Sequence, residues 1–454
     1  MKNTTVLFFS KLFEKGSLFL FFIFFGRYFG KEAFGEYSYF FSIASFLFVF
    51  MDLGGEFYQI KLFASGKNVN RLFNISVVKS ILFLGIIIPV MILNEYFLGL
   101  LILSFYTESL ISIFRSSFYF NKRFLFAAAF NIIEKTIFVT LFVLNIFSVE
   151  SLLFMYATLS ISKFIHLILV GYKKRNSLKV RNLNIDFIFW KEYLKNSWSY
   201  VLHSALVISF AQFSILLLKK FGVSYGDIAT YSVAIKIIMA IVTMFPDILF
   251  RQYYPLVTQL IYKNEKQNLG DYLNRIRKTN TILSIVLIGV LFLSAKELIF
   301  YSFGSEFSDA VLLLVFLSPV LIFRFSMYPY SAILSGSDFN YLKIIASGSS
   351  TIINLVLNYV LIPKYGIRGA AIAFIATELS LFIIYKISSR KVVELTLFPR
   401  NEILGVLIAF SPWIFISFYD QVSLIVRGVL ALLLVLTVLL MRKKFFRLFN
   451  FYYD

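Results

Sequence analysis

The chain contains no cysteine, which excludes disulfide bonds, thiol catalysis and cysteine metal sites. Histidine is almost as scarce, because His166 and His203 are the only two and they lie far apart in the sequence. We therefore expect no metal site and no cofactor. The phosphate-binding pattern G-x-x-x-x-G-K-[ST] is missing from all 454 residues, so the sequence predicts no ATPase site.

Charged residues are also scarce. They make up 15% of the chain, against ~25% in a typical soluble domain. By contrast, 59% of the residues are hydrophobic and the mean hydropathy is +0.82. Apolar runs close to the ~20 residues that cross a bilayer as a helix recur along the chain, and they are too long for barrel strands. The composition therefore predicts an all-α polytopic membrane protein.

The apolar runs predict about fourteen transmembrane helices, although charges inside several runs leave the count between twelve and fourteen. The expected spans are 6–29, 34–56, 73–93, 96–114, 124–145, 150–171, 197–220, 226–249, 279–301, 309–331, 340–362, 369–387, 403–419 and 423–441. The hydrophilic stretch 172–196 divides them after the sixth, and its second half predicts a short interfacial helix with Phe187, Trp190 and Leu194 on one side. We expect a six-helix lobe at 1–171, a cytoplasmic linker at 172–196, a second lobe at 197–388, and a helix pair with a basic tail at 389–454.

Positive charge is distributed unevenly across the expected membrane. Of the 44 Lys and Arg, 31 fall on the side of the N-terminus, six on the opposite side and seven within spans. The positive-inside rule therefore predicts that both termini are cytoplasmic. This distribution explains most of the net charge of +20 through topology and attraction to membrane lipids, so no nucleic-acid partner is needed. The outer loops are all short and leave no room for an outer catalytic domain.

Glycine-rich hairpins repeat along the chain. Residues 27–30, Arg-Tyr-Phe-Gly, match residues 219–222, Lys-Lys-Phe-Gly, and a Tyr-Ser pair follows in both copies. Because the repeat contains an even number of spans, both copies enter the membrane from the same side, as in a parallel repeat. At the third such hairpin we expect Gly366 to permit the turn and Gly369 to let the next helix start in close contact with a neighbour.

Three motifs carry a family resemblance: GRYFGKEAFGEYS (26–38) with the following MDLGG (51–55), NLVLNYVLIPKYGIRGAAIA (354–373), and ILSGSDFNYLK (333–343). The chain resembles the O-antigen type flippases of lipid-linked oligosaccharides, in the polysaccharide transporter branch of the multidrug/oligosaccharidyl-lipid/polysaccharide exporter superfamily. The resemblance implies two six-helix lobes around a cavity, alternating access, and export of an undecaprenyl-diphosphate-linked sugar of the lipopolysaccharide kind across the bacterial inner membrane. A polysaccharide polymerase or chain-length machinery would be a partner.

Other functions remain open at this stage. A multidrug or peptidoglycan-precursor exporter of the same superfamily is the nearest alternative. An excess of deep Lys and Arg over Glu favours an anionic substrate over a cationic drug. A membrane-embedded polymerase or ligase is the alternative from another class, and the short outer loops count against it. We expect a secondary transporter and not an enzyme.

Seven cations lie inside the expected spans, namely Lys79, Lys135, Lys163, Lys236, Lys296, Arg324 and Arg427. Each costs about 2.5–3.5 kcal/mol at the bilayer centre unless it pairs, snorkels or faces water. Lys236 lies about ten residues from either end of its span, too deep to snorkel well. If the layout implied by the resemblance holds, Lys236 faces the cavity and binds phosphate.

Further candidates follow from position. Lys79 and Arg324 are deep enough to join Lys236 as substrate-binding residues. Arg27 and Lys219 occupy equivalent places at the outer ends of the two lobes, where they can either bind substrate or anchor the helices at the membrane interface. The acids within spans are Glu108, Glu134 and Glu378, and Glu14 is the acid of the first helix. Glu14, Glu134 and Glu378 are the candidates for ion coupling. For Glu14 we favour neutralisation of Lys11 and Lys15 over ion coupling. Glu134 or Lys135 can instead form a structural pair across helices with Lys163 or Glu108.

Overall fold

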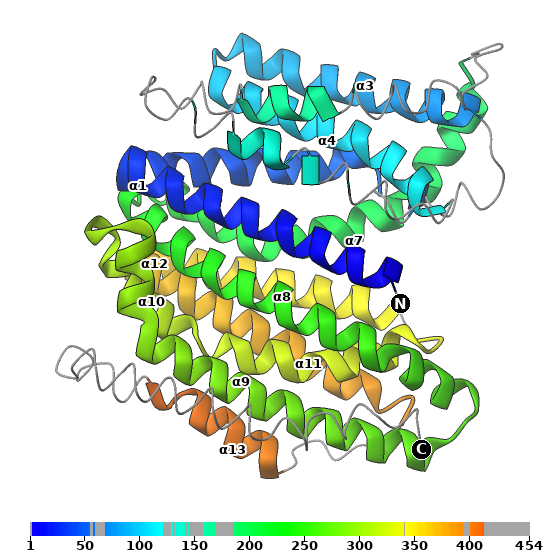
Figure 1. The fold of residues 1–454 in the computed structure, drawn as a ribbon, viewed down its shortest axis with the longest axis vertical. Helices are drawn as coiled ribbons and strands as arrows, with labels where there is room; N and C mark the ends of the chain where they lie inside the picture. The colour runs from blue at the N-terminus through cyan, green and yellow to red at the C-terminus, as the bar shows by residue number, and fades with distance from the viewer. Residues whose placement is uncertain are drawn as a thin grey trace. The chain divides into compact units, whose positions relative to one another are not determined.

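The computed structural model of the chain describes residues 2–54, 58–59, 69–120, 185–339, 341–393 and 400–412, with short pieces of the region 129–168 (Figure 1). Within these ranges every regular element is helical, which confirms the all-α fold class. Seven helical segments of the described chain are long and apolar enough to cross a membrane. Two of them contain two expected spans each, because a kink joins consecutive helices. The protein is therefore a multi-pass membrane protein.

The chain forms two compact units, Met1–Leu216 and Leu217–Asp454. This division falls inside the helix α7 (Phe187–Lys220). The expected spans at 124–145 and 150–171 lie mostly outside the described residues, and the span at 423–441 lies outside them entirely. The expected lobe boundaries and the parallel repeat stay predictions.

The first unit contains α1 (Lys2–Asp52), α3 (Val69–Ile92), α4 (Tyr96–Phe120) and most of α7. Helix α1 is two helices joined at Gly30, whose φ of 78° lies in the left-handed region that glycine tolerates. Phe25 and Phe34 flank this kink and are fully buried. Their rings meet Tyr37, with the Phe25 and Tyr37 centroids 4.9 Å apart. Helix α4 packs against both α1 and α3.

Helix α7 begins at Phe187 and continues without a break to Lys220. The short interfacial helix expected from the sequence is therefore the first part of α7. The exposure of its side chains differs from the expectation, because Trp190 packs against the core of the first unit while Phe187 and Leu194 are exposed. Trp190 turns inward because its indole nitrogen donates to Asn74 Oδ1 at 2.8 Å.

The second unit contains seven further elements. They are α8 (Tyr225–Tyr262), α9 (Lys266–Phe303), η2 (Ser305–Phe307), α10 (Asp309–Leu317), α11 (Val320–Ser335), α12 (Tyr341–Ser389) and α13 (Arg400–Ala409). The span expected at 309–331 is broken into α10 and α11 at Ser318 and Pro319, because proline lacks the N–H that a continuous helix requires. Helix α11 is almost wholly buried and packs against α8, α9 and α12.

Glycines close two hairpins of this unit. Gly222 has a φ of 77° and ends α7, while the Val223 N–H donates to the Leu218 carbonyl at 3.1 Å and the Gly222 N–H donates to the Lys219 carbonyl at 3.0 Å. Gly366, with a φ of 54°, kinks α12 as expected. A Cβ at Gly369 would overlap the Leu361 backbone, so the predicted close approach at Gly369 is confirmed.

Candidate functional site

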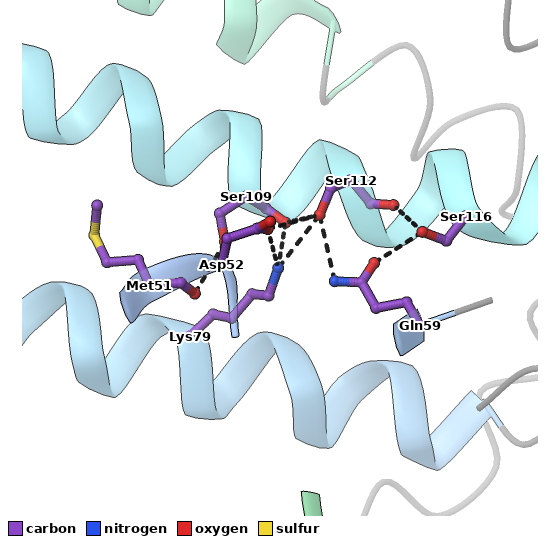
Figure 2. Close-up of polar contacts among 7 residues, drawn as sticks. All are labelled: Met51, Asp52, Gln59, Lys79, Ser109, Ser112 and Ser116. Carbon is purple, nitrogen blue, oxygen red and sulfur yellow. Dashed lines mark hydrogen bonds and ion pairs between the residues drawn. The ribbon is translucent and has the colours of Figure 1, made fainter. Parts of the chain in front are cut away.

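A buried polar cluster joins three helices of the first unit, and Lys79 lies at its centre (Figure 2). The Lys79 ammonium donates to Asp52 Oδ1 at 2.9 Å, to the Ser109 carbonyl at 2.9 Å and to Ser112 Oγ at 3.3 Å. The Lys79 side chain is 0% exposed and the Asp52 side chain is 19% exposed. These three contacts match the three hydrogens of the ammonium, so the charge of Lys79 is satisfied inside the unit.

The cluster extends along α4 and into the segment after α1. Gln59 donates to Ser112 Oγ at 3.4 Å, and the Ser116 hydroxyl donates to Gln59 Oε1 at 3.0 Å (Figure 2). Ser109, Ser112 and Ser116 follow one another at i, i+3 and i+7, which places them on one face of α4. The sequence thus builds a continuous strip of hydroxyl groups opposite Asp52 and Lys79.

The turn after α1 places Asp52 against this strip. Leu53 and Gly54 both adopt left-handed backbone, with φ values of 50° and 88°. A Cβ at Gly54 would lie 2.8 Å from Tyr200 Cβ, so only glycine fits between α1 and α7 without a shift. The glycine of the MDLGG motif therefore lets α7 pack close to Asp52.

Tyrosines from α7 and from the segment after α1 close the cluster on its remaining side. The rings of Tyr58 and Tyr193 pack 5.3 Å apart, and both are buried. Burial raises the pKa of the Tyr193 hydroxyl, the nearby negative charge of Asp52 raises it further, and a hydrogen bond with Gln59 acts in the opposite direction. Burial also raises the pKa of Tyr58. Both hydroxyls therefore stay neutral, and the two rings serve as packing groups.

A second buried charge pair lies in the other unit. The Arg324 guanidinium on α11 donates to Glu378 Oε1 on α12. Their side chains are 15% and 1% exposed. Arg324 Nε and Glu378 Oε2 are buried without a hydrogen-bond partner among the described residues. Arg324 was predicted as a substrate-binding residue and Glu378 as an ion-coupling residue, and the sequence did not predict that they pair.

The other candidates lie at different depths. Lys236 lies in the first half of α8, near the centre of its apolar stretch Tyr225–Thr243. It is half-buried, between Ile235 and Ile237, which are 4% and 2% exposed. Arg27 is exposed, three residues before the Gly30 kink. Lys219 lies at the end of α7 with its ammonium 3.6 Å from the centroid of the Tyr225 ring. The substrate-binding roles of these three cations stay predictions.

Three acids named from the sequence remain, Glu108, Glu14 and Glu134. Glu108 pairs with Lys163 at 3.3 Å, whereas from the sequence each of them was considered as a partner for Glu134 or Lys135. The side chains of Glu14 and Glu134 lie outside the described residues. In the part of the chain that the structure describes, no group of three or more His, Cys, Asp or Glu could hold a metal ion.

Sequence reasoning missed Asp52, although it stands inside the quoted MDLGG motif. Asp52 lies near the end of the expected span 34–56, where a charge gives no signal of a buried partner because it can reach water. Asn74 was also missed. Its side-chain oxygen accepts from the Asp186 N–H and from Trp190 Nε1, both at 2.8 Å, and so fixes the start of α7. The serine spacing on α4 was the one available signal for the cluster.

A protein-family model and a curated relative both connect this chain to the biosynthesis of polysaccharides or glycans. A family model described as "Polysaccharide biosynthesis protein" matches residues 1–261. The "Probable low-salt glycan biosynthesis flippase Agl15" of Haloferax volcanii is 29% identical over 149 residues, which cover 33% of this chain. The match spans 31% of that relative, about a third of its length.

Solved structures give the fold. The "Lipid II flippase MurJ, inward closed conformation" covers 98% of this chain and 99% of its own, with a TM-score of 0.72 and 16% identity. An inward-facing multidrug resistance MATE family transporter of the MOP superfamily covers 93% and 95%, with a TM-score of 0.58 and 13% identity. These likenesses show that the fold is that of MOP-superfamily transporters. Because the family model matches more than half of the sequence, the chain belongs to the polysaccharide biosynthesis protein family.

Proposed function

We propose that this protein is a flippase that moves a lipid-linked oligosaccharide from the cytoplasmic to the outer leaflet by alternating access. The observation that carries the proposal is the family match over residues 1–261, in a chain whose likeness to a solved flippase structure covers 98% of its length. The family description supports a role in polysaccharide biosynthesis. The likeness in fold to transporters supports transport over catalysis. A glycan flippase among the relatives supports the same substrate class.

The finer proposal is an undecaprenyl-diphosphate-linked repeat unit of O-antigen or a similar surface polysaccharide, exported across the bacterial inner membrane with both termini cytoplasmic. A diphosphate is anionic, and an inside-negative potential drives an anion outward by ~2.3 kcal/mol per charge per 100 mV. The lipid tail can stay in the bilayer while the polar sugar crosses inside the protein. The outward step then needs no ATP, and a polymerase or chain-length machinery would use the product.

Lys236 is our candidate for holding the diphosphate during transit, because it lies near the centre of the apolar stretch Tyr225–Thr243 and not at either end of it. Arg27 and Lys219 would act at the outer ends of their units. Arg324 is already paired with Glu378, so phosphate binding by Arg324 would compete with this pair, and we propose Glu378 as the candidate for coupling an ion to transport. Lys79 has its three hydrogens engaged by Asp52, Ser109 and Ser112, so we assign it a structural role.

A peptidoglycan-precursor exporter is the second candidate, and one observation favours it. The likeness to the Lipid II flippase extends over 98% of this chain. The two sequences are only 16% identical, which supports a common fold but not a common substrate. The substrate must therefore be tested directly.

The test is translocation by purified protein in proteoliposomes. Undecaprenyl-diphosphate oligosaccharide and lipid II, each with a labelled sugar, are placed in separate vesicle batches, and an impermeant glycosidase is added outside. Exposure of the inner-leaflet label over time measures flipping. We expect faster exposure with the oligosaccharide than in vesicles with heat-unfolded protein. Equal rates in those two samples overturn the flippase proposal, and faster exposure with lipid II favours the second candidate.

A further inference from the structure

Two hairpins of the second unit meet at one end of its helices. The ring of Phe221, which follows α7, lies 5.4 Å from the ring of Tyr359 on α12 in an edge-to-face arrangement. The ammonium of Lys220 lies 5.9 Å from the centroid of the same Tyr359 ring. Tyr359 is 60% exposed, so its ring still presents surface to the surroundings. The contact brings together residues that are almost 140 positions apart in the sequence.

The first of these hairpins is held in one conformation. Gly222 provides the left-handed turn, and Ser224 accepts a hydrogen bond from the Asp227 N–H at 3.1 Å at the start of α8. Lys219 stacks on Tyr225 at 3.6 Å, a close cation–π contact. The ammonium groups of Lys219 and Lys220 are therefore each positioned against an aromatic ring. A site whose groups are already positioned loses less entropy when it binds a ligand.

These cations lie on the side of the membrane where the positive-inside rule predicts few Lys and Arg. Lys and Arg are concentrated on the cytoplasmic side, so each cation on an outer hairpin opposes the expected topology. All six outer cations of this sequence lie in three hairpins, which carry Arg27 and Lys31, Lys219 and Lys220, and Lys364 and Arg368. The outer hairpins expected at 94–95, 146–149, 302–308 and 420–422 contain no Lys or Arg, although Lys296 and Arg427 lie near the outer ends of the adjoining spans.

Anchoring at the membrane interface does not explain this selection. Interfacial anchoring would suit every outer hairpin equally, because all of them end spans at the same surface. Instead, two of the three cationic hairpins belong to the second unit, and these are the two that the Phe221–Tyr359 contact joins. These two hairpins contain four cations and one acid, Asp227, whose carboxylate is 3.0 Å from the Ser224 hydroxyl. The joined hairpins therefore carry a net positive charge.

We propose that these two hairpins form an outer-leaflet binding site for the diphosphate of a polyisoprenyl-linked glycan, with Lys219 and Lys220 as phosphate ligands and Tyr359 as a platform for the first sugar. Lys364 and Arg368 add charge from the second hairpin. This inference rests on the proposed function and adds to it a product-side site, separate from Lys236, that receives the headgroup after the lipid has crossed. Lysine suits such a site because it binds phosphate as a point charge.

The absence of cysteine allows a local binding assay on the intact chain in nanodiscs. An environment-sensitive dye on Tyr365→Cys, a 57% exposed position in the second hairpin, reports on the site. The same dye on Tyr301→Cys, 67% exposed at the end of α9, is the control position. Farnesyl diphosphate, a soluble polyisoprenyl diphosphate, is the probe, and farnesol and inorganic diphosphate test the two halves of the ligand. Nanodiscs with and without phosphatidylglycerol test an ordinary anionic lipid as the occupant.

We expect farnesyl diphosphate to change the signal at position 365 and not at 301, and Lys219→Gln with Lys220→Gln to weaken its binding about tenfold. The matched control Lys296→Gln, an exposed lysine near the outer end of α9, should bind as the parent does. Unchanged binding by the Lys219/Lys220 double variant overturns the proposal, as does equal weakening by Lys296→Gln. Saturation by phosphatidylglycerol alone also overturns it. The assay measures binding without translocation, so its result is independent of the flipping test above.

Discussion

The ammonium of Lys79 lies 2.9 Å from the carboxylate of Asp52, and through this contact α3 holds the end of α1. The same ammonium donates to the Ser109 carbonyl on α4, so one buried charge joins three helices. Desolvation makes a buried ion pair a poor source of net stability, but removing one partner leaves an uncompensated charge. Substitution of one member of the pair should therefore destabilise the first unit.

Substitution of one member of this pair should destabilise the protein more than substitution of both. We expect Lys79→Ala to lower the free energy of unfolding by about 3–5 kcal/mol, because Asp52 loses its counter-charge. The double variant Lys79→Met with Asp52→Asn should lose much less. Thermal unfolding in detergent measures both, with Lys296→Ala as the exposed-lysine control. A double variant as unstable as Lys79→Ala would show that the charges are not coupled.

Glu378 should connect transport to an ion. In Glu378→Gln the side chain keeps its shape and can still accept a hydrogen bond from Arg324, but it cannot bind or release a proton. We expect the flipping rate of the parent protein to respond to a pH or sodium gradient, and the rate of Glu378→Gln to be the same with and without the gradient. Proteoliposome flipping at matched protein content measures this. A gradient response that survives in Glu378→Gln would assign the coupling elsewhere.

Lys236 should be required for translocation and not for folding. Lys236→Ala should abolish export while membrane abundance stays normal, and Lys236→Arg should keep part of the activity because the charge remains but the geometry changes. Lys236→Glu should be inactive because it repels an anion. The measurement is surface polysaccharide per unit of membrane-inserted protein. Full export by Lys236→Glu at normal abundance would rule out phosphate binding at this residue.

Gly54 should tolerate no side chain. In Gly54→Ala the new Cβ meets Tyr200 Cβ at 2.8 Å with the backbone at a φ of 88°, so we expect a loss of about 1–3 kcal/mol. Gly85→Ala is the matched control, because Gly85 is helical and a Cβ there meets nothing within 4 Å. Melting temperatures of the two variants should move in opposite directions, since alanine favours a helix interior over glycine. A Gly54→Ala protein as stable as the parent would show that α7 can move away from α1.

The membrane topology can be tested without purification. Reporter fusions after residues 185, 265 and 395 should be cytoplasmic, and fusions after 32, 224 and 365 should be external, as the distribution of Lys and Arg requires. Alkaline phosphatase and green fluorescent protein give opposite signals on the two sides. A cytoplasmic signal after residue 224 would show that the charge argument fails at the α7–α8 hairpin, and it would remove the outer-leaflet site proposed there.

The sequence alone determined much of the fold. Apolar runs predicted most helices of the described chain, because only a helix satisfies every backbone polar group inside a bilayer. Glycines predicted the kinks at Gly30 and Gly366, because those positions need a left-handed backbone that side chains disfavour. The quoted motifs also indicated the family that the comparison found over residues 1–261.

The tertiary structure decided which charges meet. Arg324 and Glu378 were separate candidates in the sequence, 54 positions apart, and Asp52 was overlooked as the partner of Lys79. Such contacts depend on how far each helix is rotated about its axis and how deep it lies. A helix that is apolar on all sides carries little periodicity to fix that rotation. Packing against α4, α11 and α12 sets the rotation instead, and the buried ion pairs, like the Lys220–Tyr359 contact, exist only once it is set.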